Sequence, residues 1–161
     1  MDTPLDFLKI NVDAAVGNSA IAFAMVVRNQ AGNLVFLASC ISEPLEPDLA
    51  ELKALTWAVN HACEFGWTNV IWCSDAKNVI KEVGADTEPI GWKSRDDLLL
   101  IKQRRSEHGW SFVWTPREAN AVADLVAKHS LSNMCNLFFF LLPSNIAKQV
   151  WCDHFGYDSM M

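Results

Sequence analysis

Apolar and polar residues alternate near the start of the chain as they do in a β-strand. In the segment FLKINVDAA, residues 7–15, apolar side chains share one face and polar side chains, Asp13 among them, share the other. Two more apolar runs, at 20–28 and 33–40, are joined by a turn signal that contains Gly32. Because the connections are short, the three segments are predicted to form an antiparallel meander.

Helical spacing of apolar residues first appears after the prolines of the next segment. Asp48 stands where an N-cap is expected, the predicted helix runs to about Phe65, and Gly66 is typical of a residue that ends a helix. Pro116 suits the first turn of the last helix. The remaining pattern predicts a strand, a short helix, a second helix, a strand and a last helix at 69–74, 76–83, 95–106, 110–115 and 117–131.

The predicted order of elements is βββ-α-β-α-α-β-α, which indicates an α/β fold. Three antiparallel strands followed by right-handed crossovers give one mixed five-stranded sheet with helices on both faces. The expected strand order is 3-2-1-4-5, with strand 2 antiparallel to a central first strand. Residues 1–133 would form this domain. Residues 134–161, an apolar run, Pro143 and an amphipathic helix predicted around 146–151, form a C-terminal extension expected to pack on the domain.

Four carboxylates interrupt the apolar pattern, each on a different predicted element. They lie within the first strand, at the edge of the apolar face of the first helix, at the end of the fourth strand and on the mostly non-polar face of the last helix: Asp13, Glu51, Asp75 and Asp124. Each alone is compatible with a solvated carboxylate, or with one paired to Lys or Arg.

As a set, the four acids favour a different interpretation, because a mixed sheet can bring their elements together. Clustered carboxylates repel one another and raise each other's pKa unless a cation lies between them. Oxygen ligands suit Mg²⁺ or Mn²⁺. Two such ions can hold the attacking water and the leaving oxygen of a phosphodiester.

Four segments in the same order resemble the ribonuclease H family: KINVDAA, LAELKALTWAVNHACEFGWTNV, IWCSDAKNVI and FVWTPREANAVADLVAK. They look most like the plant branch related to the ribonuclease H domains of non-LTR retroelement reverse transcriptases. The resemblance is collinear over residues 7–131, and the four acids fall where the metal-binding acids of that family fall.

The resemblance implies a metal-dependent endoribonuclease that hydrolyses the RNA strand of RNA–DNA hybrids with two Mg²⁺ ions, for which Mn²⁺ can substitute. By the family pattern, Asp13, Glu51 and Asp75 would hold the metals and Asp124 would complete the second site. Asn120, one turn before Asp124, matches the REAN-type motif of the family.

Two alternative functions remain at this point: a catalytically weak module that binds nucleic acid or a protein partner, and a structural domain of a larger retroelement-derived chain. The four intact acids favour the enzyme. Two differences from the family pattern favour the weak module: Ala14 stands where Gly is common after the first acid, and the loop TPREAN lacks a His.

The net charge of the chain is −6, yet residues 92–117 carry six basic against three acidic side chains. This basic region could contact phosphates of the hybrid, because backbone contacts dominate nucleic-acid affinity; it could equally be a solvated helix face. Trp92 could stack on a base or sugar, or be buried. The substrate-binding candidates are therefore Asn120, Arg117, Lys93, Arg104, Arg105 and Trp92.

Composition and the terminal segments predict an intracellular protein, nuclear or cytoplasmic. Five Cys without a CxxC pair are typical of free thiols in a reducing compartment. The acidic N-terminus does not have the pattern of a signal peptide. The longest apolar run, at 137–142, is too short to span a membrane. That run could instead dock a protein partner or simply cover the sheet, and the sequence leaves the oligomeric state open.

Overall fold

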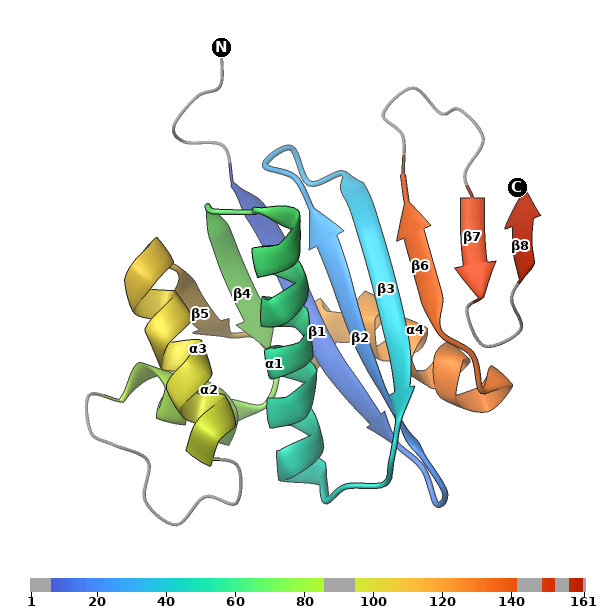
Figure 1. Cartoon of the computed structure of the whole chain (residues 1–161), viewed down its shortest axis with the longest axis horizontal. Helices are drawn as coiled ribbons and strands as arrows, with labels where there is room; N and C mark the ends of the chain where they lie inside the picture. Colours follow the sequence, from blue (N-terminus) through green and yellow to red (C-terminus); the bar gives the residue numbers. More distant parts are fainter. Residues whose placement is uncertain (1–6, 86–94, 142–148, 153–156, 161) are drawn as a thin grey trace.

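The computed structural model describes residues 7–85, 95–141, 149–152 and 157–160. These segments contain one mixed sheet whose strands lie in the order β5-β4-β1-β2-β3-β6-β7-β8 (Figure 1). The strands span Leu8–Val16 (β1), Ile21–Arg28 (β2), Leu34–Ser42 (β3), Val70–Ser74 (β4), Ser111–Trp114 (β5), Leu137–Phe140 (β6), Gln149–Cys152 (β7) and Tyr157–Met160 (β8).

The predicted arrangement of the first five strands is confirmed. β2 pairs antiparallel with both β1 and β3, while β4 lies parallel to β1 and β5 lies parallel to β4. The order 3-2-1-4-5 follows, with β1 in the centre of these five strands. The hydrophobic alternation and the short turns therefore predict the sheet correctly up to β5.

Beyond the last helix the sheet continues, which the sequence analysis did not predict. β6 pairs antiparallel with β3, and β7 and β8 follow it in the same sheet. The amphipathic helix predicted around 146–151 is wrong for 149–151, because these residues belong to β7; residues 146–148 lie outside the described segments. The physical reason is the open edge of β3, whose N–H and C=O groups need partners that an added strand supplies. The division into units at residue 133 stays a prediction.

The helices lie on both faces of the sheet, as predicted. They span Pro47–Phe65 (α1), Lys77–Gly84 (α2), Arg95–His108 (α3) and Ala121–Asn133 (α4), and a short 3₁₀ helix, Arg117–Asn120 (η1), precedes α4. α1 and α3 pack together, and α4 crosses β1, β2 and β3 on the other face (Figure 1). No helix of the described segments is long and apolar enough to span a membrane.

Two helix starts differ from the prediction, and a proline lies at or directly before each. α1 begins at Pro47, with Glu46 as its N-cap, so Asp48 lies inside the first turn. The first N–H groups of a helix have no partner within it, and proline has no N–H to leave unpaired. Pro47 therefore suits the first helical position, and the helix begins earlier than a cap at Asp48 would allow. Pro116 lies before η1 rather than in the first turn of a continuous helix. The end of α1 is confirmed, since Gly66 has φ 73°.

The two faces of the sheet are covered by different kinds of core. Bulky side chains fill the α1 face, where Trp72 stacks on Phe112 with ring centroids 5.8 Å apart. On the α4 face the core is small, with Ala15, Ala24 and Ala127 in contact, so the helix can approach the sheet closely. Because both faces are covered, most of the polar face predicted for β1 is also buried: Asn11 and Asp13 keep only 4% of their surface exposed, whereas Lys9 near the start of the strand is exposed.

Candidate metal centre

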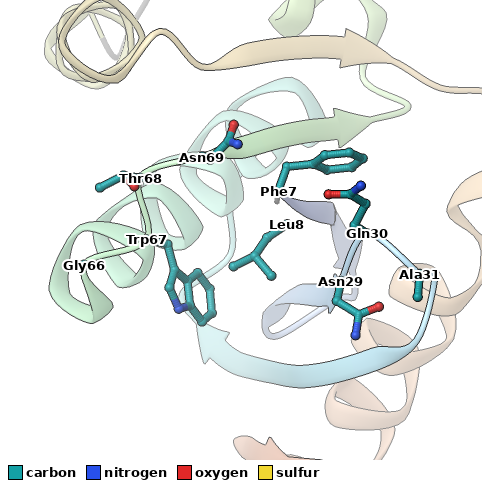
Figure 2. Close-up of a pocket in the computed structure, with 9 residues that line it drawn as sticks. All are labelled: Phe7, Leu8, Asn29, Gln30, Ala31, Gly66, Trp67, Thr68 and Asn69. Atoms are coloured by element: carbon teal, nitrogen blue, oxygen red, sulfur yellow. The ribbon is translucent and has the colours of Figure 1, made fainter. Parts of the chain in front are cut away.

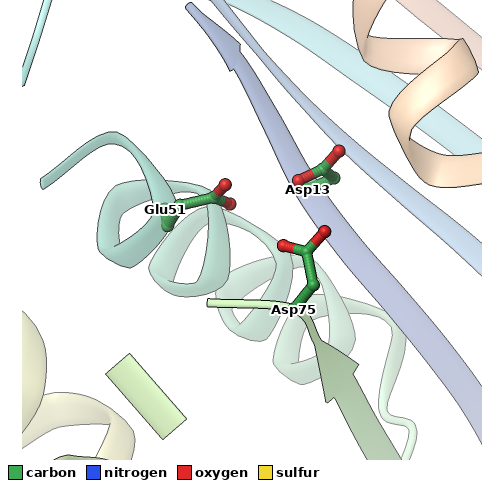
Figure 3. Close-up of side chains that lie close together, drawn as sticks. All are labelled: Asp13, Glu51 and Asp75. Atoms are coloured by element: carbon green, nitrogen blue, oxygen red, sulfur yellow. The ribbon is translucent and has the colours of Figure 1, made fainter. Parts of the chain in front are cut away.

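Two of the predicted acids meet where neighbouring parallel strands separate. The pairing of β1 with β4 ends at Val12 and Ser74, and the next residues along the two strands are Asp13 and Asp75. β1 continues beyond this point in its pairing with β2. The two carboxylates therefore stand side by side where β4 leaves the sheet, and Figure 3 shows them pointing toward one another.

The third acid comes from the beginning of α1. Glu51 is half-buried and precedes Leu52, which is fully buried against the sheet. The helix thereby directs the Glu51 side chain to the gap between the strands (Figure 3). Carboxylate oxygens of Asp13, Glu51 and Asp75 all lie within 4.8 Å of one another. The predicted convergence of these three residues is confirmed.

Asp124 lies close to Asp13 but is not part of the three-acid cluster of Asp13, Glu51 and Asp75. Its carboxylate forms an ion pair with Lys128, one turn later on α4, at 3.0 Å. Its negative charge and a side-chain hydrogen bond nevertheless contribute to the raised pKa of Asp13. A role for Asp124 as a metal ligand stays a prediction, and Lys128 would compete with the ion for its charge.

Burial and mutual repulsion shift the titration of two of the acids. The pKa of Asp13 is raised from 3.8 to about 7, mainly by burial and also by the negative charge of Asp75. A hydrogen bond from the backbone N–H of Ala14 acts in the opposite direction and lowers this pKa. Burial likewise raises the pKa of Glu51 from 4.5 to about 9, with added repulsion from Asp13 and Asp75. Near pH 7 the cluster therefore holds protons that a bound cation would displace.

The donor set of the cluster fits a hard divalent cation. Among the described residues, no Lys, Arg or His forms an ion pair with Asp13, Glu51 or Asp75. The Oε1 atom of Glu51 is buried and has no hydrogen-bond partner in the described part of the chain. An unpartnered buried carboxylate oxygen is costly. Carboxylate oxygens alone are the ligands that Mg²⁺ and Mn²⁺ prefer.

The start of α4 is held to β1 by a buried pair of amides. Asn11 donates to Asn120 Oδ1 at 2.9 Å, and Asn120 donates from Nδ2 to the carbonyl of Val12 at 3.1 Å. Only 1% of the surface of Asn120 is exposed. Asn120, predicted to bind substrate, is thus a buried residue that positions η1 and α4 next to Asp13. Asn11 was not singled out by the sequence, although an amide inside a buried strand was the available signal.

We expect Asn120→Ala to destabilise the protein by about 1–3 kcal/mol, because it leaves the buried amide of Asn11 without its acceptor. Urea unfolding in chelator measures this change. The matched control is Asn133→Ala at the other end of α4, where, within the described residues, the exposed amide bonds to His129 of the same helix; we expect a change within about 0.5 kcal/mol. Equal effects of the two substitutions would contradict the anchoring role of Asn120.

A cleft of about 420 Å³ opens next to the cluster. Its walls come from the start of α1, the start of α2 and the end of β5, and they include Glu51, Asp75, Lys77, Trp114 and Arg117. The cleft gives the cluster access to solvent. Of the predicted substrate-binding residues that the structure describes, Arg117 lines this cleft.

A larger pocket, of about 730 Å³, lies at the opposite end of β1 and does not include the acids. Figure 2 shows its lining, which combines Phe7 and Trp67 with the amide side chains of Asn29, Gln30 and Asn69. Because it lies beside the start of β1, whereas the cluster lies beyond the middle of that strand, at the end of β4, this pocket is separate from the candidate metal centre.

The remaining predicted substrate-binding residues are not brought to the cluster by the described structure. Arg104 pairs with Glu107 at 2.8 Å on α3, and Arg105 is exposed on the same helix. Arg104 lies near Cys63, in the last turns of α1, whereas Glu51 lies in its first turns. Trp92 and Lys93 lie outside the described residues. Contacts of these four residues with a substrate stay predictions.

The strand order, the helices on both faces and the acids at the parting of β1 and β4 define a ribonuclease H-like fold. A family described as reverse transcriptase-like matches residues 11–130, most of the chain. The chain therefore belongs to this family, which is a ribonuclease H-like one. No curated protein sequence matches it closely enough to count as a relative.

Solved structures with the same fold include ribonucleases H and reverse transcriptases. RNase H1 from the halophilic archaeon Halobacterium salinarum NRC-1 is 24% identical, with a TM-score of 0.64 over 79% of this chain and 98% of that one. LC11-RNase H1 in complex with an RNA/DNA hybrid is 18% identical, with a TM-score of 0.69 over 79% and 98%.

A foamy viral protease-reverse transcriptase, also in complex with an RNA/DNA hybrid, is 14% identical, with a TM-score of 0.62 over 77% of this chain and 19% of that one. At these identities the likeness of all three structures establishes the fold alone.

Proposed function

We propose that this protein is a metal-dependent endoribonuclease that hydrolyses the RNA strand of RNA–DNA hybrids. The observation that carries the proposal is the three-acid cluster, whose carboxylates converge within 4.8 Å. Two of its members, Glu51 and Asp75, line a cleft that opens to solvent. Two structural neighbours hold RNA/DNA hybrids, which supports the choice of substrate.

Asp13, Glu51 and Asp75 would hold a divalent cation, and Asp124 would complete a second site. When bound, two such ions activate a water molecule and neutralise the charge that develops on the scissile phosphate. Asp13 lies on β1, Asp75 directly follows β4 and Glu51 lies on α1, so all three are placed by regular elements of the fold. Placement on such elements favours a defined position for the phosphate.

Charge is the main obstacle to binding a polyanion, and the metal centre reduces it. The formal net charge of the chain, with every carboxylate ionised, is −6, and two divalent ions would bring it to −2. Arg117, in the lining of the cleft, adds a cation beside the place where a phosphate would lie. We therefore infer that metal and hybrid bind cooperatively.

A catalytically weak ribonuclease H-like module is the second candidate, and the ion pair between Asp124 and Lys128 is the observation that favours it. If Lys128 keeps the fourth acid occupied, the second metal position is incomplete. Such a module would bind nucleic acid or a protein partner with little hydrolysis.

The deciding experiment is cleavage of an end-labelled RNA strand, offered as an RNA–DNA hybrid, as duplex RNA and as single-stranded RNA. We expect cleavage of the hybrid with Mg²⁺ or Mn²⁺, and none in chelator. Asp75→Asn should lower the rate by more than about 100-fold, since loss of a direct ligand exceeds the usual effect of outer residues. Binding of the hybrid without cleavage would favour the weak module. A result of neither binding nor cleavage would overturn the enzyme and the nucleic-acid-binding module, and would leave only a module that binds a protein partner.

A further inference from the structure

One exposed aromatic residue lines the cleft beside the acids. Trp114, the last residue of β5, keeps 45% of its surface exposed. Its register partner on β4 is Ser74, the residue before Asp75. The ring therefore stands on the strand next to a proposed metal ligand, at the edge of the sheet.

The contacts of Trp114 distinguish it from an ordinary core residue. Phe112, two positions earlier on the same side of β5, stacks on Trp72 in the core. The Trp114 ring instead lines the cleft, and the Nζ atom of Lys77 lies over it, 5.4 Å from the ring centroid. The backbone beyond it is anchored, because Thr115 N–H donates to the carbonyl of Ser74 at 2.9 Å. An exposed aromatic ring at an anchored strand end and a cation thus lie together beside the acids.

We propose that Trp114 is a substrate-contact residue whose ring packs against the sugar of the nucleotide next to the scissile phosphate. The inference rests on the proposed function of the cleft. Bases within a duplex are covered by their neighbours, whereas the sugars and phosphates are exposed. We therefore expect an aromatic ring beside the scissile phosphate to contact a sugar and not a base. Lys77 and Arg117, which line the same cleft, supply positive charge for the adjoining phosphates.

The chain offers a closely matched control. Val113 precedes Trp114 on β5 and is equally exposed, at 45%. As the neighbouring residue of a strand, it points to the opposite face of the sheet, away from the cleft. Val113→Ala therefore also removes exposed apolar surface from the edge strand, though less than Trp114→Ala does, without changing the cleft.

The experiment measures binding of a fluorescently labelled RNA–DNA hybrid in chelator, followed by steady-state cleavage with Mg²⁺. We expect Trp114→Ala to raise Kd and KM about tenfold while kcat stays within about twofold, and Trp114→Phe to retain most of the affinity. Val113→Ala should behave as wild type. The inference is overturned if Trp114→Ala and Val113→Ala bind the hybrid equally well, or if only kcat falls.

A spectroscopic measurement keeps the inference falsifiable even if Trp114→Ala folds poorly. The fluorescence of Trp114 is obtained as the difference between wild type and Trp114→Phe, because the chain has seven Trp. Addition of hybrid should change this difference signal; an unchanged signal during saturable binding would overturn the inference and leave the proposed function intact. A wild-type protein that neither binds nor cleaves the hybrid would overturn both.

Discussion

In chelator, Asp75→Asn is expected to unfold at a higher temperature than the wild-type protein. The substitution removes one of the charges that raise the pKa values of Asp13 and Glu51, and it hardly changes the side-chain volume. For a domain of this size, each kcal/mol of repulsion that is removed raises Tm by roughly 2–4 °C. Thermal unfolding followed by circular dichroism measures the shift.

The same two proteins should respond differently to metal. Wild type is expected to gain stability as Mg²⁺ or Mn²⁺ is added, about 2.7 kcal/mol when the ion reaches 100 times its Kd. Asp75→Asn should gain much less, because one carboxylate of the cluster is lost. This readout is independent of cleavage, so it tests the metal centre by itself.

Asp96→Asn is the matched control for net charge. Asp96 is exposed in the first turn of α3, so its substitution changes the formal charge equally without touching the cluster. It should leave the response to metal as in wild type, and it should not raise Tm. The contrary result would be that Asp75→Asn is less stable than wild type in chelator and that neither Mg²⁺ nor Mn²⁺ changes the Tm of wild type. Asp75 would then be a structural carboxylate, and the proposed metal centre would be wrong.

The metal-free protein is also expected to lose stability as the pH rises from about 4 to about 9. Folding raises the pKa of Asp13 from 3.8 to about 7 and that of Glu51 from 4.5 to about 9. Within that window the folded state binds more protons than the unfolded state, so the free energy of unfolding falls as pH increases. The slope is at most about 1.4 kcal/mol per pH unit for each group.

Urea unfolding in chelator at several pH values measures this dependence. Glu51→Gln should flatten the curve above about pH 7, where Asp13 has already lost its proton. The stabilisation that added metal gives should instead increase with pH, because the ion binds the deprotonated carboxylates and displaces their protons. Its stabilising effect on wild type should therefore grow up to about pH 9. A metal-free stability that is constant across this window would contradict the raised pKa values.

Local patterns in the sequence, together with the right-handed crossover rule, were sufficient for the five-stranded order of the sheet. Strand alternation in residues 7–15 depends on neighbouring side chains, and Gly66 ends α1 because few other residues adopt its positive φ. Such features involve residues close together in the chain. The C-terminal strands were not predictable in the same way, because β6 is stabilised by its pairing with β3, about a hundred residues earlier.

The sequence by itself also determined which residues are unusual: four acids on four elements that otherwise bury apolar surface. Only the tertiary structure decided how they are used. The separation of β4 from β1 brings Asp13 to Asp75, α1 adds Glu51, and Lys128 pairs with Asp124. The exposure of Trp114 in the cleft depends likewise on the pairing of β5 with β4. Distances between side chains remote in sequence are set by strand register and helix packing, and no local pattern contains them.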